Sequence, residues 1–346
     1  MSSQRPVAQS SGCTWIQDTE PPTNQRFQGA SWLDTSSIPH VLKAWDSSTW
    51  VVQDYLGIEG QVGIGGYAAG GSSNNTHIEK LTFSTETPSS VVSTLPTGVR
   101  AVVGWTSGTS AGYTAGGWAP QSTIQKMLFS NESTAAVTSG LVTVRGWGGA
   151  NHSATTGYLS GGWSGPGVDT SVIDKMVFST EATSSIASVL SISRANLREG
   201  PNTPSVGYVQ GGTDQFNAKF TRIDKLAFSS EAISSLSSGL SVTRDLISSG
   251  DSVSSGYALA GNNVGYVTNV DKITFSSDAV ALLSSGFPTA KQDAATPDSK
   301  IKAYYMGGDG GNTSINFLTY SSDILGTLAS SLTTANASQA GFENLS

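Results

Sequence analysis

A repeating unit of 45 to 50 residues constrains the fold of this chain more than any other feature. A Gly-Tyr pair recurs once in each unit, and Ala303-Tyr304 continues the series. Each unit also contains an aromatic residue that is followed twelve residues later by Leu or Phe. These pairs are Phe83 and Leu95, Phe129 and Leu141, Phe178 and Leu190, Phe228 and Leu240, Phe275 and Phe287, and Tyr320 and Leu332. Six equal intervals identify a repeat protein.

Each unit predicts four short strands rather than a pair of helices. In one unit the expected strands are 101–105, 112–117, 124–130 and 135–144. The Gly-Gly pairs and the runs rich in Ser, Thr and Val oppose long helices. Glycine accounts for 40 of 346 residues and charged residues for only 12%, as in a β-rich, turn-dense protein. Four strands in a unit of this length are typical of a β-propeller blade.

The predicted propeller has six blades and spans residues 57–346. Five blades begin with an innermost strand, whereas the strand at 62–71 has no inner strand before it. The segment 336–345 has the inner-strand position and nothing after it. We therefore expect this C-terminal strand to close the first blade, because ring closure leaves few exposed strand edges.

Residues 1–56 lie outside the repeat and form a separate region. Residues 1–24 are polar and contain proline, which predicts an extended arm. The runs 31–35, 40–45 and 49–53 are aromatic or β-branched, so three short antiparallel strands are expected there. Trp32, Trp45 and Trp50 would form their small core or dock onto a neighbour.

The repeat resembles the kelch repeat over about residues 61–346. The shared order is Arg, a short strand, Tyr-x-x-Gly-Gly, a loop, an aromatic third strand, an acidic turn and a fourth strand. Leu stands where kelch repeats usually have Trp. The segment WLDTSSIPHVLKAWDSSTWV is similar to a module of phage tail and fibre proteins, and IDKMVFSTEATSSIASVLSISR resembles the repeats of kelch-like proteins in tailed phages, cyanophages among them.

These resemblances imply a structural protein of a phage tail or fibre, located in the virion. Residues 1–56 would attach it to other virion proteins, and several copies or a homo-oligomer are expected. The propeller would contact the host surface, with a glycan as the ligand. One alternative is a virion decoration or connector protein without a ligand. A secreted carbohydrate-active enzyme is the least favoured alternative.

Two sets of residues are candidates for ligand binding. Large aromatics lie in loops of variable length, where blade packing does not require them: Trp118, Trp163, Phe216, Phe220 and Tyr266. A series of basic residues precedes the inner strands: Arg100, Arg145, Arg194, Arg244 and Lys291. This series would gather an anion at one mouth of the channel, or would instead satisfy carbonyls and acids between blades. Both sets are expected on one face, since alternating strands bring their loops together there.

Other functions are not indicated by the sequence. A net charge of −7 leaves no basic stripe for nucleic acid, and no apolar run is long enough for a membrane span. His40, His77 and His152 are far apart, and the single Cys13 gives no metal-ligand spacing. No nucleophile with a partner base is evident. We expect no cofactor, no metal and no enzymatic activity.

Overall fold

The computed structural model describes residues 64–108, 110–309 and 312–345 with their side chains. Before these it describes Ser48 and the backbone of residues 15–17, 31–34, 40–45 and 50–56. The chain divides into two compact units, Met1–Val62 and Gly63–Ser346. Each is described by itself below.

The N-terminal unit contains a four-stranded sheet in the order β1-β2-β3-β4. Its strands are β1 (Trp15–Gln17), β2 (Ser31–Asp34), β3 (His40–Trp45) and β4 (Trp50–Leu56). β2, β3 and β4 are antiparallel, as expected from the sequence. β1 corrects the prediction of an extended arm, because it pairs in parallel with β2. Three residues are too few to show strand periodicity. The rest of the arm and the tryptophan side chains lie outside the described residues.

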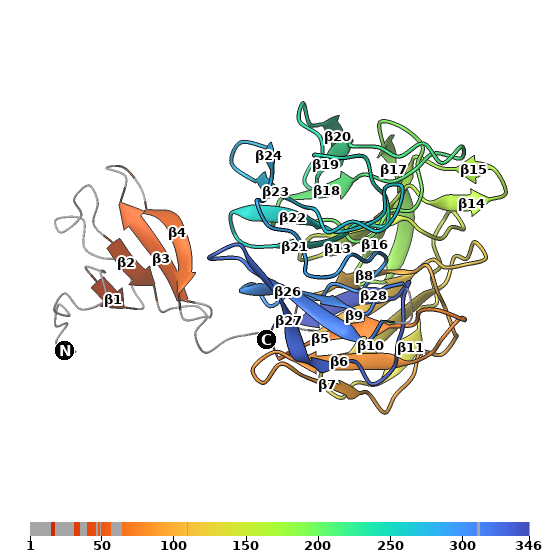
Figure 1. Ribbon diagram of the computed structural model, residues 1–346, viewed down its shortest axis with the longest axis horizontal. Helices are drawn as coiled ribbons and strands as arrows, with labels where there is room; N and C mark the ends of the chain where they lie inside the picture. The colour runs from red at the N-terminus through yellow and green to blue at the C-terminus, as the bar shows by residue number, and fades with distance from the viewer. Residues whose placement is uncertain are drawn as a thin grey trace. The chain divides into compact units, whose positions relative to one another are not determined.

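The second unit is a six-bladed β-propeller, which confirms the predicted fold class (Figure 1). Blade 1 contains β28 (Ala340–Asn344), β5 (Gly65–Ala69), β6 (Ile78–Thr82) and β7 (Thr87–Ser90). Blade 2 contains β8 (Val103–Thr106), β9 (Ala111–Ala115), β10 (Ile124–Leu128) and β11 (Thr134–Ala136). Blade 3 contains β12 (Gly149–His152), β13 (Thr156–Ser160), β16 (Val172–Val177) and β17 (Ala182–Val189). The connection from β13 to β16 contains a separate hairpin of β14 (Trp163–Gly165) and β15 (Val168–Asp169).

The remaining three blades follow the same plan. Blade 4 contains β18 (Val206–Gln210), β19 (Ile223–Ala227) and β20 (Ala232–Ser235). Blade 5 contains β21 (Ser248–Asp251), β22 (Ser255–Leu259), β23 (Val270–Thr274) and β24 (Ala279–Leu282), and blade 6 contains β25 (Lys302–Met306), β26 (Ser314–Thr319) and β27 (Ile324–Ser331). The inner segments of blades 4 and 6 pair only through isolated bridges. Each contains a proline, Pro201 or Pro297, which cannot donate to a strand ladder.

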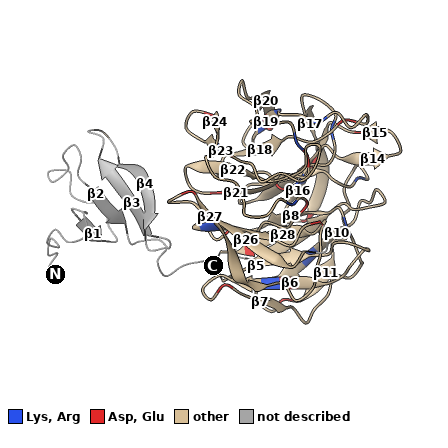
Figure 2. Cartoon of the chain, in the orientation of Figure 1, with Lys and Arg blue, Asp and Glu red and all other residues tan. Residues whose placement is uncertain are grey.

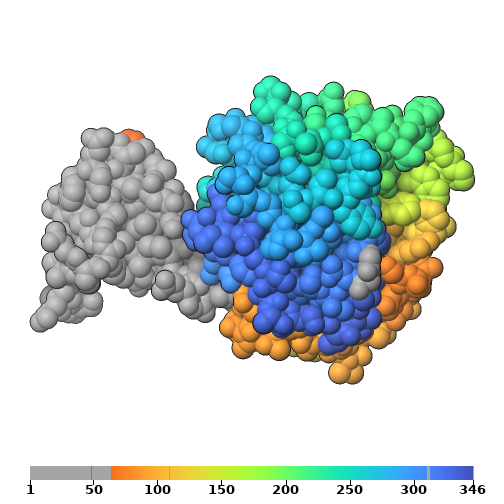
Figure 3. All heavy atoms as spheres, viewed as in Figure 1, coloured from red at the N-terminus to blue at the C-terminus, as the bar shows by residue number. Residues whose placement is uncertain are grey.

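The C-terminal strand closes the ring, as predicted. β28 is the innermost strand of blade 1 and pairs antiparallel with β5 from Ala340↔Ala69 to Asn344↔Gly65. In Figure 3 the blue residues from the last part of the chain, which include blade 6, lie beside the orange residues of blade 1. Because β5 has β28 on one side and β6 on the other, it has no open edge.

Conserved spacing in the repeat corresponds to contacts between neighbouring blades. The tyrosine on the second strand of each blade stacks on the aromatic residue at the end of the third strand of the next, as Tyr113 does on Phe178 at 5.5 Å between ring centroids. The last contact, Tyr304 on Phe83 at 5.3 Å, joins blade 6 to blade 1. A glycine precedes most of these tyrosines because a Cβ at Gly112, for example, would lie 2.0 Å from the Phe342 ring.

A polar contact accompanies each aromatic stack, and we call it the interblade clasp. In the first clasp, the Tyr67 hydroxyl and Lys80 Nζ both donate to Glu132 Oε1, at 3.1 and 2.6 Å. The acceptors of the six clasps are Glu132, Glu181, Glu231, Asp278, Asp323 and Glu86. Each acid occupies a turn at positive φ, and its carboxylate also links two blades.

Candidate binding face

Two sets of loops meet on one face of the propeller, which we call the loop face. They are the loops between the second and third strands and the segments that lead into the inner strands. Their backbones are hydrogen-bonded to each other: Trp118 N–H donates to Arg100 O at 2.9 Å, and Trp163 N–H donates to Gly146 O at 2.8 Å. Residues from neighbouring blades therefore share this surface.

Most of the predicted basic ring is buried and structural. Arg145, Arg194 and Arg244 have no exposed surface. Each forms an ion pair with an acid on the third strand of its own blade, Asp174 at 2.5 Å, Asp224 at 3.2 Å and Asp271 at 2.6 Å. Their guanidinium groups also donate to backbone carbonyls. Residues in this position cannot collect an anionic ligand at the channel mouth, so the structure favours the alternative role inside the blades.

Lys291 continues this series in blade 6, but without an acid. Its Nζ donates to the carbonyls of Tyr305 and Ser314 at 3.3 and 3.1 Å, and burial lowers its pKa to about 7. The position of the acid in this blade holds the neutral Asn316. Charge is thus reduced on both sides of the pair, which avoids an unpaired buried carboxylate.

Arg100 does not belong to the series. The equivalent of Arg145 in blade 2 is Val99, since Val99 bridges to Asn75 just as Arg145 bridges to Gln121. The acid position opposite Val99 is also neutral, because Gln125 stands there and exchanges hydrogen bonds with the Thr97 backbone. The Arg100 side chain is instead half-buried on the loop face.

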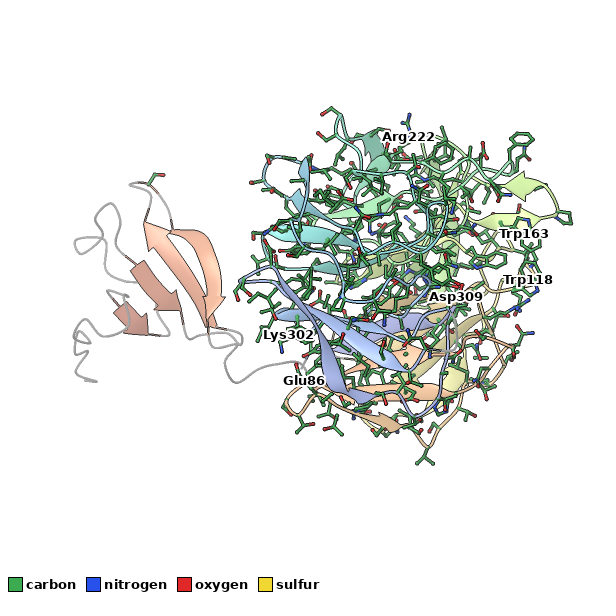
Figure 4. The ribbon with its side chains drawn as sticks, viewed as in Figure 1. Glu86, Trp118, Trp163, Arg222, Lys302 and Asp309 are labelled. Atoms are coloured by element: carbon green, nitrogen blue, oxygen red, sulfur yellow. The ribbon has the colours of Figure 1, made fainter. Side chains whose placement is uncertain are left out.

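Arg100 lies against a cluster of three tryptophans, which we call the tryptophan cluster. Trp118 and Trp163 stack at 4.8 Å with 11° between their planes. Trp147 meets Trp118 edge-on at 4.7 Å. The Arg100 guanidinium sits 5.0 Å from the centre of the Trp118 ring, a cation–π contact. All three rings are partly exposed, and Figure 4 shows Trp118 and Trp163 side by side at the edge of the ring of blades.

Trp147 was not identified from the sequence, and its backbone is unusual. Its φ is 50°, in the left-handed region. The equivalent residues of the other blades, among them Ala101, Asn196 and Leu246, share this conformation, so the repeat imposes it. A bulky aromatic residue is rare there. The choice of tryptophan is therefore not explained by the backbone and points to a role for the ring itself.

Polar groups flank the tryptophan cluster. Asp169 pairs with Trp163 in the β14–β15 hairpin. Burial, and secondarily the charge of Asp214, raises the pKa of Asp169 to about 6. Asp169 Oδ2 and Arg100 Nε are buried and have no hydrogen-bond partner among the described residues. The partly exposed tryptophan rings form a flat apolar surface, which matches what the face of a sugar ring requires.

The other predicted aromatics differ in exposure. Phe216 is 80% exposed and Tyr266 is 47% exposed, so both present their rings to solvent on the loops of blades 4 and 5. Phe220 is only partly exposed and lines a groove in blade 4. The five predicted aromatics therefore lie on one face but in three places, and only Trp118 and Trp163 contact each other.

The centre of the ring is closed by polar side chains. Its cavity is lined by inner-strand residues of all six blades, including Glu199, Asp251, Asp298 and Glu343. The cavity volume is about 30 Å³, enough for about two water molecules. Burial raises the pKa of Glu343 to about 8, with Lys300 opposing and Asp298 adding to the shift. A sugar does not fit there, and the loop face remains the accessible surface.

Neither metal-binding nor membrane-spanning features are found in the described residues. No group of three or more His, Cys, Asp or Glu side chains among them is arranged to hold a metal ion. In the same residues no helix is long and apolar enough to cross a membrane. His77 lies 3.5 Å from Glu79, and His152 lines the central cavity. His40 belongs to the part described by backbone alone.

Charged residues are sparse along the propeller, without a long basic stretch (Figure 2). The distribution in the described residues agrees with the low charged fraction of the sequence, 12%. Most of the charge that is present belongs to the interblade clasps and the buried pairs already described.

Comparison with known proteins supports the fold and no more. No protein-family model matches the sequence, and no curated protein is similar to it. Solved structures do match, among them one described as the structure of YjhT, with a TM-score of 0.60 and 12% identity. The match covers 70% of this chain and 87% of that chain. An identity this low shows a shared architecture alone, so the chain is a six-bladed β-propeller with an additional N-terminal unit.

Proposed function

We propose that this chain is a structural protein of a phage tail or fibre whose propeller binds a host-surface glycan with its loop face. The tryptophan cluster carries the proposal. Its rings are partly exposed on the loop face, Asp169 pairs with Trp163, and the Arg100 guanidinium lies over Trp118. Aromatic rings with a few polar groups are the usual means of binding sugars in an open site.

The virion setting of the proposal rests on the resemblances of residues 32–51 and of the repeats. In this setting the N-terminal unit anchors the protein to other virion proteins, in several copies or as a homo-oligomer. A virion assembled with a chain lacking residues 1–56 tests the anchor. The truncated propeller is expected to fold and to be missing from purified particles. Incorporation at the normal level would instead indicate that the blades bind the other virion proteins.

Glycan binding is tested with Trp163→Ala on a glycan array and in adsorption to host cells. We expect the variant to lose at least about 1 kcal/mol of binding free energy, as a contributing interface residue does. Val253→Ala is the matched control, because Val253 is exposed in a loop between the first two strands of blade 5, on the opposite face. Trp163→Phe retains an aromatic ring and should retain most of the binding.

A second candidate function is a virion connector without a ligand. The mutual stacking of Trp118 and Trp163 favours it, since rings that cover each other also hold two loops together. Because of this contact, Trp163→Ala should lower stability as well as binding. Unchanged adsorption together with a lower melting temperature would give preference to the connector. Loss of adsorption by Trp163→Ala, with circular dichroism unchanged, supports glycan binding.

A further inference from the structure

Blade 4 departs from the repeat at two neighbouring positions on the loop face. Arg222 lies six residues before the aromatic residue of the third strand, where the other blades have His77, Thr123, Val172, Asn269 and Ser314. Phe220 lies eight residues before it, where the others have Asn75, Gln121, Thr170, Val267 and Asn312. Blade architecture does not require a permanent cation or an aromatic ring at these positions, because five blades form without them.

These two residues line an open groove of about 310 Å³. Thr221 lies between them, and the opposite wall consists of Leu236, Ser237, Ser238 and Gly239. The outer strand β20 ends at Ser235, at the position where the outer strands of blades 1, 2 and 5 also end, whereas in blade 3 Val189 still pairs with Val172. No residue of β20 therefore pairs with Arg222. Its volume lies at the lower end of the range for small-ligand sites, about 300–1,000 Å³.

Hydrogen bonds to two serine hydroxyls fix the position of the Arg222 guanidinium. Its Nη1 donates to Ser191 Oγ and to Ser235 Oγ, both at 3.1 Å. Both hydroxyls in turn donate to the buried Asp224, at 2.8 and 2.6 Å to Oδ1. This network orients the guanidinium without neutralising it, since no ion pair joins Arg222 to a carboxylate in the described part of the chain.

The remaining N–H groups of Arg222 are available to a ligand. The side chain is exposed, and its described hydrogen bonds use Nη1 only. A guanidinium binds a carboxylate through two parallel hydrogen bonds, which a lysine cannot reproduce. The partly exposed Phe220 ring and Leu236 supply apolar contact beside it, while Ser237 and Ser238 add exposed hydroxyls. Figure 4 shows Arg222 beside β20, apart from Trp118 and Trp163.

We propose that the blade 4 groove is a subsite for a sugar residue bearing a carboxylate, with Arg222 binding the carboxylate and Phe220 contacting the ring. The proposal rests on the glycan-binding function given above and adds the class of sugar. A host polysaccharide with acidic residues would then contact the loop face at two places, the tryptophan cluster and this groove.

The test uses the full chain and two probes that differ only at one carbon, methyl glucuronide and methyl glucoside. Binding is followed by the NMR signal of the Arg222 Nε–H group and by competition with an acidic oligosaccharide. We expect the glucuronide to bind at least about tenfold more tightly than the glucoside, as for a charge-assisted bidentate pair. Equal binding of the two probes would overturn the proposal.

Variants locate the site. Arg222→Gln should remove the preference for the glucuronide, Arg222→Lys should retain part of it, and Phe220→Leu should weaken both probes. Asn269→Gln, at the equivalent position of blade 5, is the control and should behave as the wild type. A preference that survives Arg222→Gln would overturn the proposal. So would displacement of the glucuronide by inorganic sulfate with no detectable contribution from the sugar ring, which would indicate a simple anion site.

The outcome is separable from that of the proposed function. Failure of glycan recognition at the tryptophan cluster appears as unchanged adsorption in Trp163→Ala. Failure of the acidic subsite appears as an unchanged sugar preference in Arg222→Gln. Melting curves of both variants show whether the fold is retained. If Arg222→Gln is unstable, Arg222→Lys replaces it in the test, because lysine keeps a positive charge near the buried Asp224.

Discussion

The buried pair of blade 3 can be exchanged for the neutral pair that blade 2 already contains. Val99 and Gln125 occupy in blade 2 the positions of Arg145 and Asp174 in blade 3. In blade 2 the Thr97 N–H donates to Gln125 Oε1 at 2.8 Å, and in blade 3 the Thr143 N–H donates to Asp174 Oδ2 at 2.9 Å. The variant Arg145→Val/Asp174→Gln therefore places a known arrangement in a neighbouring blade.

The expected magnitudes follow from burial. Arg145 and Asp174 both have 0% exposed side-chain surface, so either single substitution leaves a buried charge without its partner. Such a change costs about 3–5 kcal/mol. The double variant buries no charge, and its amide can accept from Thr143. What remains is the cavity left by the shorter side chain at position 145, which costs about 1–3 kcal/mol. We expect the double variant to be at least about 3 kcal/mol more stable than the sum of the single effects predicts.

The free energy of unfolding of the wild type, both single variants and the double variant is measured by urea denaturation at neutral pH. The four values form a double-mutant cycle. Additive effects would refute the reasoning, because they would mean that the two side chains do not depend on each other. The reasoning would also fail if Asp174→Gln alone cost less than about 1 kcal/mol, since the buried guanidinium would then need no carboxylate.

Three further predictions concern closure, the clasps and pH. Deletion of residues 340–346 removes β28 and exposes the edge of β5, so gel filtration should show aggregation and the melting temperature should fall; an unchanged melting curve would contradict ring closure by this strand. Glu132→Gln removes the charge that binds Lys80 and Tyr67. Because Glu132 and Lys80 are 29% and 23% exposed, the free energy of unfolding measured in urea should fall by about 1–2 kcal/mol. An unchanged free energy of unfolding would mean that Glu132 serves the turn alone and does not stabilise the contact between blades. Burial raises the pKa of Glu343 to about 8 from 4.5, so the folded state keeps its proton while the unfolded chain loses it, and stability should fall as the pH rises from 4.5 to 8. Glu343→Gln should flatten that slope in thermal melts, and parallel slopes for the two proteins would refute the assignment.

The fold was predictable because the repeated residues make repeated contacts. Each blade places its tyrosine on the next blade's aromatic residue, so the spacing in the sequence reflects one geometry used six times. The clasps were harder to infer, because their partners come from different repeats. In blade 6 the lysine has also moved, since Phe317 occupies the usual position and Lys302 on the adjacent strand reaches Glu86 instead.

The candidate site was only partly predictable. Arg100 belongs to the predicted basic series although it follows Leu95 by five residues, whereas Arg145 follows Leu141 by four. That one-residue difference could have indicated that Arg100 is not equivalent to Arg145. The buried position is taken by Val99, and the Arg100 side chain lies at the surface. Trp147 and Arg222 were also detectable as exceptions to the repeat at their positions. Their significance depends on neighbours from other loops, such as Trp118 and Ser191, which spacing alone does not reveal.

The pairing of β5 on both sides has a mechanical consequence. The N-terminal unit precedes β5 directly in the sequence, so a pull on that unit is transmitted first to this strand. All five residues of β5 pair with β28 on one side and with β6 on the other. A force along the strand loads both ladders in shear at once, whereas an edge strand would peel away one hydrogen bond at a time. A propeller tethered through its first blade can thus carry a load on the tether without its ring being opened from that end.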